Sequence, residues 1–267
     1  VRTIQEEEDL SRRINLGEGR DEIYRLAATF DKMLGQIEDS MKREKQFTSD
    51  VSHELRTPLS VILMQCDSLL SHDSLPDEIR EEITVIQRKA GGLSRMVSQL
   101  LLLSRADQGR EKVTMETLDF SGISEMAAVE MAVMAEEKGI RLETNISPGV
   151  MLYGDETLLI RLWLNLLQNA VTYGKEGGCI YMSLQEEGEA VTGCVKDDGI
   201  GISAEDLPHI WERFYRADSS RNDVGSSGLG LSMVQWIVNA HNGTIQAVSE
   251  PGRGSTFTFC LPNEKKS

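Results

Sequence analysis

Apolar residues in the first seventy positions recur at spacings of three and four, which places them on one stripe of a helix. Apart from Pro58, which the pattern tolerates, no helix breaker interrupts the series before its end, so the pattern predicts one helix of about 50 residues, a length typical of coiled coils. The stripe consists of Ile23, Leu26, Phe30, Met33, Ile37, Met41, Phe47, Val51, Leu55, Pro58, Ile62, Cys66 and Leu69.

A second helical stripe follows the turn SHDSLPDE. Pro76 stands near the first helical position, and Asp77 and Glu78 occupy the first turn, where the helix dipole favours acids. Two antiparallel helices cannot bury both stripes alone, so the pattern predicts a homodimeric four-helix bundle. The second stripe ends near Asp107 and consists of Ile79, Ile83, Ile86, Ala90, Leu93, Val97 and Leu100.

The long helical stripes end at a charged linker, residues 109–115. Beyond it, short alternating or apolar runs predict strands between helices. We therefore expect an α+β domain, a two-layer sandwich with helices on one side of a mixed sheet, after the all-α coiled coil and bundle. The predicted helices are 121–137, 155–173 with Asp155 as N-cap, and 229–240; the predicted strands are 140–146, 151–153, 180–186, 190–196, 244–249 and 256–261.

Composition narrows the class of protein. The 267 residues suffice for two or three units, and the net charge of −15 argues against nucleic acid or an anionic membrane surface as a partner. Since no run of about 18 apolar residues occurs, and the chain starts at Val1, we expect a cytoplasmic fragment of a longer protein. The scattered Cys66, Cys179, Cys194 and Cys260 form no CxxC pair, which predicts reduced, mostly buried thiols.

One histidine lies off the apolar stripe, within FTSDVSHELRTPL at residues 47–59. At about 100° per residue, His53 and Thr57 fall on the helix face opposite Val51, one turn apart. Neutral imidazole is a nucleophile near pH 7, and the neighbouring Glu54 carboxylate can take or orient its other proton. His53 is therefore a candidate nucleophile, the alternative being an ordinary surface or core histidine. No partner residues are evident for His72, His209 or His241, and no role is predicted for them.

Two asparagines, Asn165 and Asn169, lie one turn apart at the edge of the apolar face of their helix. Their side-chain carbonyl oxygens are hard ligands that suit Mg²⁺ in the company of phosphate oxygens. Structural capping is the alternative for this pair.

An acidic turn follows the strand that ends at about residue 196. Within VKDDGIGI, Gly199 and Gly201 allow close backbone approach, and Asp197 can accept a hydrogen bond from an exocyclic amine such as adenine N6. The string by itself is also compatible with a simple turn.

A second glycine-rich string, GSSGLGLS at residues 225–232, directly precedes a helix whose first N–H groups can bind phosphate. It is neither a Walker A loop nor a dinucleotide fingerprint, because no GKS or GKT follows and no strand comes directly before it. The polar stretch between the two glycine strings predicts a mobile lid. Arg213, Arg216 and Arg221 in that stretch are candidate γ-phosphate ligands or, alternatively, solvated surface charge.

These strings resemble those of sensor histidine kinases. SHELRTPL resembles the phospho-acceptor box, and NLLQNA, DDGIGI, ERFYR, GSSGLGL and GRGSTF resemble, in order, the N, G1, F, G2 and G3 boxes of the Bergerat ATP-binding domain. EEDLSRRINLGEGRDEIYRLAATFDKM resembles the second half of a HAMP linker, which normally follows a transmembrane helix; a generic dimerising helix is the alternative. The resemblance implies a partial HAMP linker at 1–38, a dimerisation and phosphotransfer hairpin at 39–110 and a catalytic domain at 115–262, in a fragment of a cell-membrane protein.

The resemblance also implies site residues. Asn169 is the first candidate for the Mg²⁺ ligand and Asn165 the second. Two positions depart from the family pattern, since Thr172 replaces the usual Lys and Asp198 the usual Asn. The other implied ATP contacts are Tyr173, Asp197, Gly199, Gly201, Phe214, Arg216, Gly228, Leu229 and Gly230.

The implied activity is phosphorylation of His53 by ATP·Mg²⁺, with Glu54 as base, followed by transfer to an aspartate of a response regulator. The HExxT arrangement also suggests hydrolysis of the phosphorylated regulator, with Thr57 holding the attacking water. Two rivals remain open: a degenerate kinase that acts as a dimeric scaffold, and an ATPase of the gyrase, Hsp90 or MutL kind.

Overall fold

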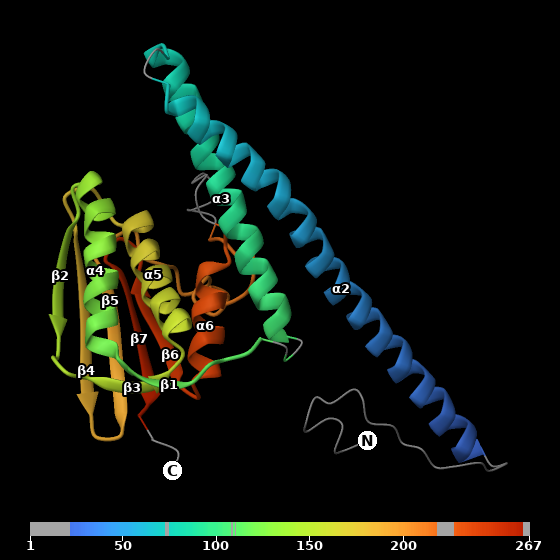
Figure 1. The fold of residues 1–267 in the computed structure, drawn as a ribbon. Coiled ribbons are helices and arrows are strands. Elements are labelled where there is room, and N and C mark those ends of the chain that lie inside the picture. Colours follow the sequence, from blue (N-terminus) through green and yellow to red (C-terminus); the bar gives the residue numbers. More distant parts are fainter. Residues whose placement is uncertain (1–21, 73–74, 108, 110, 218–226, 264–267) are drawn as a thin grey trace. The chain divides into compact units, whose positions relative to one another are not determined.

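The computed structural model describes residues 22–72, 75–107, 109, 111–217 and 227–263. The chain divides into two compact units, Val1–Gln108 and Gly109–Ser267. The described part of the first unit is helical and the second is an α/β layer structure (Figure 1). The connector of the predicted HAMP segment lies outside the described residues.

The helical unit is a hairpin of two long helices. They are α2 (Glu22–Leu70) and α3 (Asp77–Asp107), as the apolar stripes predict. The guanidinium of Arg80 donates to the carbonyl oxygens of Leu70, at 2.9 Å, and His72, at 3.1 Å. Because the last carbonyls of a helix have no partner within it, these bonds cap α2 and fix the turn.

The two stripes of the hairpin are only half buried. Leu59 of α2, which was not part of the predicted stripe, packs with Ala90 and Val97 of α3, which are seven residues apart. Cys66 and Ile83 are buried as well. The alternate positions are 42% to 52% exposed: Leu55, Ile62, Leu69, Ile79, Ile86 and Leu93. The hairpin therefore leaves an apolar stripe along each helix without cover from the other.

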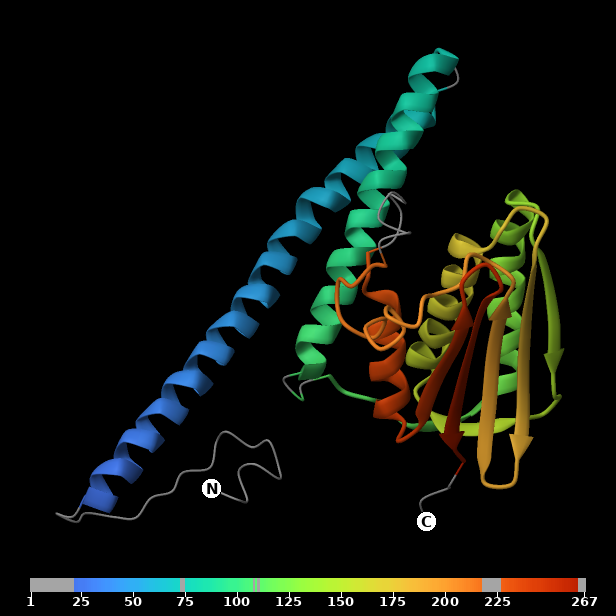
Figure 2. The same cartoon turned by 180° about the vertical axis from the view of Figure 1, so that it is seen from behind.

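The second unit has a five-stranded mixed sheet in the order β2-β4-β5-β7-β6. Strand β2 pairs parallel with β4, and the other pairs are antiparallel. Helices α4, α5 and α6 lie on one face, and Figure 2 shows the other face free of helices, which confirms the predicted α+β layer. The elements are α4 (Phe120–Glu137), β2 (Arg141–Ile146), α5 (Glu156–Tyr173), β4 (Cys179–Glu187), β5 (Ala190–Asp197), α6 (Gly230–Ala240), β6 (Thr244–Glu250) and β7 (Gly254–Pro262).

The core of this unit lies between sheet and helices. Trp163 of α5 packs edge-on against Phe259 of β7, with ring centroids 4.9 Å apart, and Phe120 completes the cluster. Gly193 stands opposite Phe259 in the β5–β7 register, where a Cβ atom would come within 2.1 Å of the ring. The missing side chain therefore makes room for the aromatic core.

One strand differs from the prediction. Residues 116–119, expected to belong to the approach to a helix, form strand β1 (Glu116–Asp119), which pairs with β3 (Met151–Gly154) in a separate two-stranded sheet. Only Leu118 of β1 is buried, so the segment carries no alternating pattern. Its strand state depends on pairing with a distant segment.

The four cysteines are free, but only Cys66 is buried. The prediction of mostly buried thiols is wrong, because Cys179, Cys194 and Cys260 are partly exposed. They alternate with core positions such as Val195, and successive strand residues face opposite sides of a sheet. In the part of the chain that the structure describes, no helix is long and apolar enough to cross a membrane.

Candidate functional site

The second half of α5 carries three of the predicted residues at four-residue spacing. Asn165, Asn169 and Tyr173 are partly buried along one edge of the helix. The Asn165 side-chain nitrogen donates to the carbonyl oxygen of Arg161 at 2.7 Å, which orients the amide. A Cβ atom at Gly230 would lie 3.2 Å from the Asn165 side-chain oxygen, so this oxygen lies beside the start of α6.

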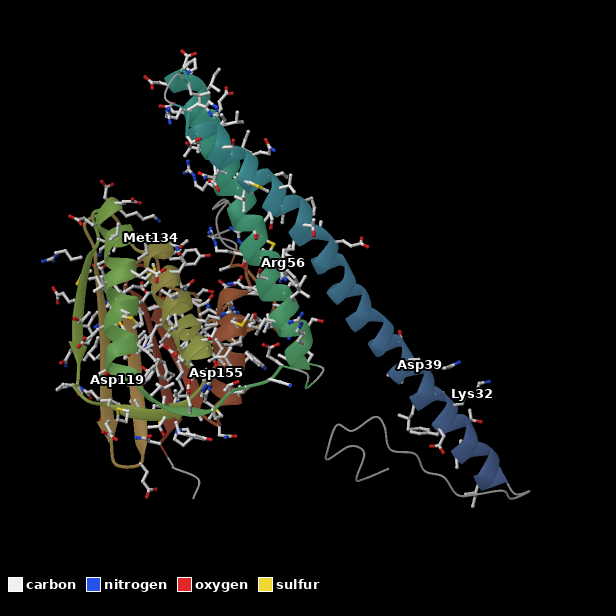
Figure 3. All side chains as sticks on the ribbon, in the orientation of Figure 1. Lys32, Asp39, Arg56, Asp119, Met134 and Asp155 are labelled. Atoms are coloured by element: carbon white, nitrogen blue, oxygen red, sulfur yellow. The ribbon has the colours of Figure 1, made fainter. Side chains whose placement is uncertain are left out.

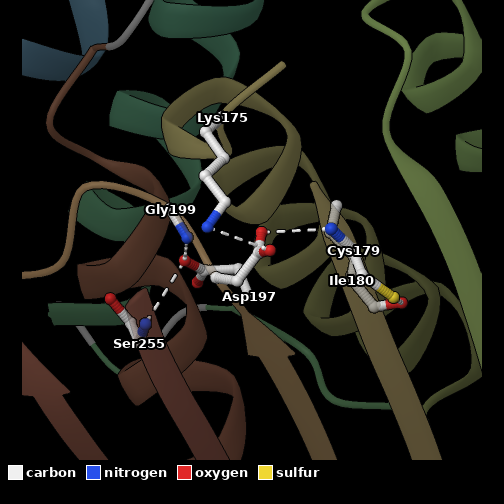
Figure 4. Close-up of polar contacts among 7 residues, drawn as sticks. Lys175, Cys179, Ile180, Asp197, Gly199 and Ser255 are labelled. Atoms are coloured by element: carbon white, nitrogen blue, oxygen red, sulfur yellow. Dashed lines mark hydrogen bonds and ion pairs between the residues drawn. The ribbon is translucent and has the colours of Figure 1, made fainter. Parts of the chain in front are cut away.

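Asp197 ends β5 and is 5% exposed. Its Oδ1 accepts the backbone N–H groups of Gly199, at 2.9 Å, and Ser255, at 3.2 Å (Figure 4). Burial raises the pKa of this carboxyl group, and the two N–H donors oppose the rise. Because both bonds fall on Oδ1, the carboxyl group is held in one orientation and Oδ2 takes part in neither bond.

Asp198 makes separate contacts. Its Oδ1 accepts the N–H of Cys179 at 3.0 Å, and its Oδ2 lies 3.3 Å from the Lys175 ammonium (Figure 4). The side chain therefore belongs to the turn. An acid in place of the usual Asn has a local ion-pair partner here.

The first glycine turn packs on the β6–β7 hairpin. Gly201 has a φ of 68°, and a Cβ atom there would lie 2.1 Å from the carbonyl oxygen of Glu250. The N–H of Gly252 donates to the Ile200 carbonyl oxygen at 2.7 Å. Glycine is therefore required both for the left-handed backbone and for the close approach.

The second glycine turn is joined to the predicted lid phenylalanine. The N–H of Phe214 donates to the carbonyl oxygen of Gly228 at 2.9 Å, and both residues have positive φ, 61° and 68°. Glycine adopts this region freely, whereas for phenylalanine it costs of order 1–3 kcal/mol. Arg216 is partly buried beside them and Arg213 is exposed, while Arg221 lies outside the described residues.

The start of α6 supplies backbone donors. The first N–H groups of a helix have no acceptor within it and carry the positive end of its dipole, so they favour phosphate. Buried Leu229 anchors this start, directly before Gly230. No three His, Cys, Asp or Glu side chains of the described residues gather where they could hold a metal ion. A cation here would rely on amide and phosphate oxygens.

The candidate phospho-acceptor lies on the other unit, in α2. The backbone of His53 is helical, while its side chain lies outside the described residues. Glu54, Arg56 and Thr57 are exposed, and Figure 3 labels Arg56. Pro58 stands inside the helix and lacks an N–H, so it breaks one helical hydrogen bond just beyond the histidine.

Three residues near the site were not predicted to take part. The backbone of Ser255 fixes Asp197, and Lys175 pairs with Asp198. The ammonium of Lys138 donates to the carbonyl oxygens of Val171, at 3.1 Å, and Thr172, at 3.3 Å, and so caps α5 where the family pattern has its Lys side chain. Only Ser255 lay within a recognised string, GRGSTF.

Two family models match the chain. Residues 43–109 match the His Kinase A (phospho-acceptor) domain, and residues 154–265 match the histidine kinase-, DNA gyrase B- and HSP90-like ATPase.

Curated relatives match most of the chain. The sensor-like histidine kinase SenX3 of Mycobacterium tuberculosis is 36% identical over 220 residues, which cover 82% of this chain and 53% of that protein. The signal transduction histidine-protein kinase BaeS of Escherichia coli is 32% identical over 246 residues, covering 92% of this chain and 52% of that protein. The chain therefore spans about half the length of these relatives.

Solved structures agree on the fold. Full-length ShkA in complex with AMPPNP superposes with a TM-score of 0.67 at 27% identity, covering 81% of this chain and 45% of ShkA. The Acinetobacter baumannii histidine kinase AdeS has the same fold, with a TM-score of 0.58 at 23% identity over 80% of this chain and 98% of AdeS.

Proposed function

This chain belongs to the sensor histidine kinases of the HisKA type, and from that premise we propose that it transfers the γ-phosphoryl group of ATP to His53 and then to an aspartate of a response regulator. The observation that carries the proposal is the site of the second unit. There a buried, oriented carboxylate at Asp197, the Asn165 amide and a helix start flanked by glycines belong to one domain.

Nucleotide binding follows from the chemistry of these groups. The exocyclic amine of adenine would donate to Oδ2 of Asp197, and the N–H groups at the start of α6 would donate to the phosphate oxygens. The similar ShkA structure contains AMPPNP, an analogue of ATP, which supports this assignment. Tyr173, Phe214 and Arg216 are also proposed nucleotide contacts, because they match nucleotide-binding positions of the family.

Asn165 and Asn169 fit Mg²⁺ that is also bound by phosphate. Amide oxygens suit a small hard cation, and the orientation of Asn165 by the Arg161 carbonyl leaves its oxygen beside the start of α6. When bound, Mg²⁺ supplies charge neutralisation and holds the phosphate oxygens in place.

The transfer itself needs placement more than covalent chemistry by the protein. One imidazole nitrogen of His53 attacks the γ-phosphorus, the bond to the β,γ-bridging oxygen breaks, and ADP leaves. Glu54 takes or orients the proton on the other nitrogen, which stabilises the charged phosphoimidazole. A carboxylate of the regulator then attacks the same phosphorus and neutral His53 is restored.

The proposal includes dimerisation of the chain and attachment of the longer protein to a membrane. The exposed stripes of α2 and α3 support a homodimeric four-helix bundle, in which each stripe would face a second hairpin. The segment at 1–38, similar to the second half of a HAMP linker, supports attachment to a membrane segment in the longer protein. Nothing in the charge of the chain favours nucleic acid.

The test is labelling of the full chain with γ-³²P-ATP. Wild-type protein should acquire acid-labile, base-stable phosphate, and His53→Ala should abolish it while nucleotide still binds. Labelling of His53→Ala at the wild-type level would overturn the assignment. ATP turnover without phosphohistidine would favour the gyrase-like ATPase, and absence of both would favour the scaffold.

A further inference from the structure

His241, to which the sequence assigned no role, is buried at the carboxyl end of α6 and is 3% exposed. Its Nε2 lies 3.0 Å from the backbone nitrogen of Asp155, and its Nδ1 lies 2.8 Å from the carbonyl oxygen of Ile237. Because a backbone N–H can only donate, Nε2 is the acceptor, so Nδ1 carries the proton and donates to Ile237. The ring is therefore neutral, with both nitrogens in use.

Gly154, which has no side chain, leaves space for the His241 ring. A Cβ atom at Gly154 would lie 3.1 Å from two atoms of the His241 ring, Cδ2 and Nε2, and 2.7 Å from a methyl group of Leu159. A side chain at position 154 would therefore force the Leu159 methyl group to move and would press on the ring. The end of β3 is thus shaped to accept the imidazole.

Asp155 joins three segments at the same point. Its N–H donates to His241, its Oδ1 accepts the N–H of Leu158 at the start of α5, and its Oδ2 accepts the N–H of Thr114 at 2.8 Å. We call this group of contacts, between Asp155, His241 and Ile237, the end contact of α5 and α6. It fixes the first turn of one helix to the last turn of the other.

The end contact lies far from the nucleotide site along both helices. Figure 3 labels Asp155 at the end where α5 begins, and Asn165 follows ten residues later, about 15 Å along the axis at 1.5 Å per residue. On α6, Gly230 lies beside Asn165 and His241 comes eleven residues after it. The two helices therefore run antiparallel, joined at one end and flanking the proposed phosphate site at the other.

A helix is stiff along its axis, and its ridges pack into the grooves of its neighbour, so an axial shift at one end of a helix moves its other end as well. We propose that His241 is a positioning residue: through the end contact it sets the axial register of α6 against α5, and so places the start of α6 beside Asn165 and Asn169. The proposal rests on the proposed function of this site. His241 touches no reacting group and acts only through the two helices.

A specific consequence separates this role from general stabilisation. The phosphate end of the site is built from α5 and α6, whereas Asp197, the proposed adenine ligand, stands on β5 and is held by Gly199 and Ser255. Loss of the end contact should therefore weaken binding of the magnesium-bound triphosphate and spare the binding of the nucleoside part.

The experiment compares His241→Phe with His241→Gln in the full chain. Phenylalanine fills the space but cannot accept from Asp155, whereas glutamine offers an acceptor and a donor in similar positions. By calorimetry, His241→Phe should bind AMPPNP with Mg²⁺ about tenfold more weakly than wild type and adenosine in EDTA within about twofold, as expected for coupling through packed elements. His241→Gln should stay within about twofold for both ligands.

His72→Phe is the matched control, because His72 is exposed on the helical unit. Melting temperature without nucleotide reports folding, and if His241→Phe does not fold, the smaller His241→Leu replaces it. Equal weakening for both ligands, no weakening for either, or a glutamine variant as impaired as phenylalanine would overturn the positioning role. Failure of wild type to bind either ligand would instead overturn the proposed function, and the positioning role with it.

Discussion

Asp197 combines burial with two backbone donors on a single oxygen, so its orientation does not depend on a ligand. In Asp197→Asn, the amide oxygen can still accept from Gly199 and Ser255, but the nitrogen turns toward the ligand as a donor. An adenine amine would then meet a donor instead of an acceptor. We expect ATP affinity to fall at least about tenfold, since an unpaired buried polar group costs about 1–3 kcal/mol.

Calorimetric titration of AMPPNP into the variant measures this loss, with the melting temperature as a check that the fold survives. Asp198→Asn is the matched control, because Asp198 accepts from Cys179 and faces Lys175. Unchanged affinity in Asp197→Asn would remove Asp197 from the site.

His241 gives the stability of the chain a pH dependence of definite sign. Burial lowers the pKa of His241 below its ordinary value of 6.5, while the hydrogen bond to Ile237 and the charge of Asp155 oppose this. A lowered pKa means that the folded state favours the neutral ring. The stabilisation is therefore complete above about pH 6.5 and is lost as the pH falls through the lower, folded-state pKa.

Urea unfolding of the second unit between pH 8 and pH 5, followed through its tryptophan fluorescence, measures this effect. The midpoint should decline toward acid more steeply in wild type than in His241→Gln, which has no titrating group at this position. A midpoint that declines equally in both proteins would contradict the expected contribution.

The sequence predicted some site residues and missed others for a physical reason. Asp197 and the glycine turns are local strings, readable within a few residues. The partners that hold them are distant: Ser255 is 58 positions from Asp197, His241 is 86 from Asp155, and Lys138 is 33 from Val171. Only the fold brings these pairs together, so no pattern of spacing indicates them.

At the scale of elements, long periodic segments were predicted well and the shortest strand was not. Helices α2 and α3 each carry an apolar stripe over many turns, and their ends match the predicted ones. Strand β1 has four residues and gains its conformation from pairing with β3. Periodicity alone, however, does not predict which positions of a stripe face the other helix of the hairpin and which stay exposed.

The exposed positions of the stripes predict a dimer that one charge can disrupt. Ile62 is 42% exposed in the hairpin, so Ile62→Glu should leave the hairpin folded while placing a carboxylate in the proposed bundle core. Burying an unpaired charge costs several kcal/mol, which exceeds the roughly 1.5–3 kcal/mol that one buried Ile supplies. We expect a shift from dimer to monomer.

Sedimentation velocity distinguishes the two states, and circular dichroism reports retained helix. Met64→Glu is the control, because Met64 is exposed on the same helix and lies about 200° around the helix from Ile62. A monomer in both variants, or a dimer in both, would contradict the proposed packing.

At the scale of the whole molecule, two reactions would take place on one face of α2: phosphorylation of His53 and hydrolysis of the phosphorylated regulator. His53 and Thr57 stand one turn apart, and the described Thr57 is exposed. This exposed hydroxyl is our candidate for the group that orients a water molecule beside a phosphorylated regulator. Glu54, by contrast, neighbours His53 in sequence and is the candidate for proton transfer during phosphorylation of the imidazole.

Thr57→Ala should separate autophosphorylation of His53 from hydrolysis of the phosphorylated regulator. We expect autophosphorylation within about twofold of wild type and a phosphorylated regulator that survives about a hundredfold longer in its presence, the low end of what one positioned hydrogen-bonding group contributes. Ser60→Ala is the matched control, since Ser60 lies on the same helix with its hydroxyl already donating to the Arg56 carbonyl oxygen at 3.0 Å. The measurement is the decay of ³²P on a cognate regulator after removal of ATP. Equal decay with Thr57→Ala and wild type would assign the water to another group, and a parallel loss of His53 labelling would make Thr57 part of the forward transfer.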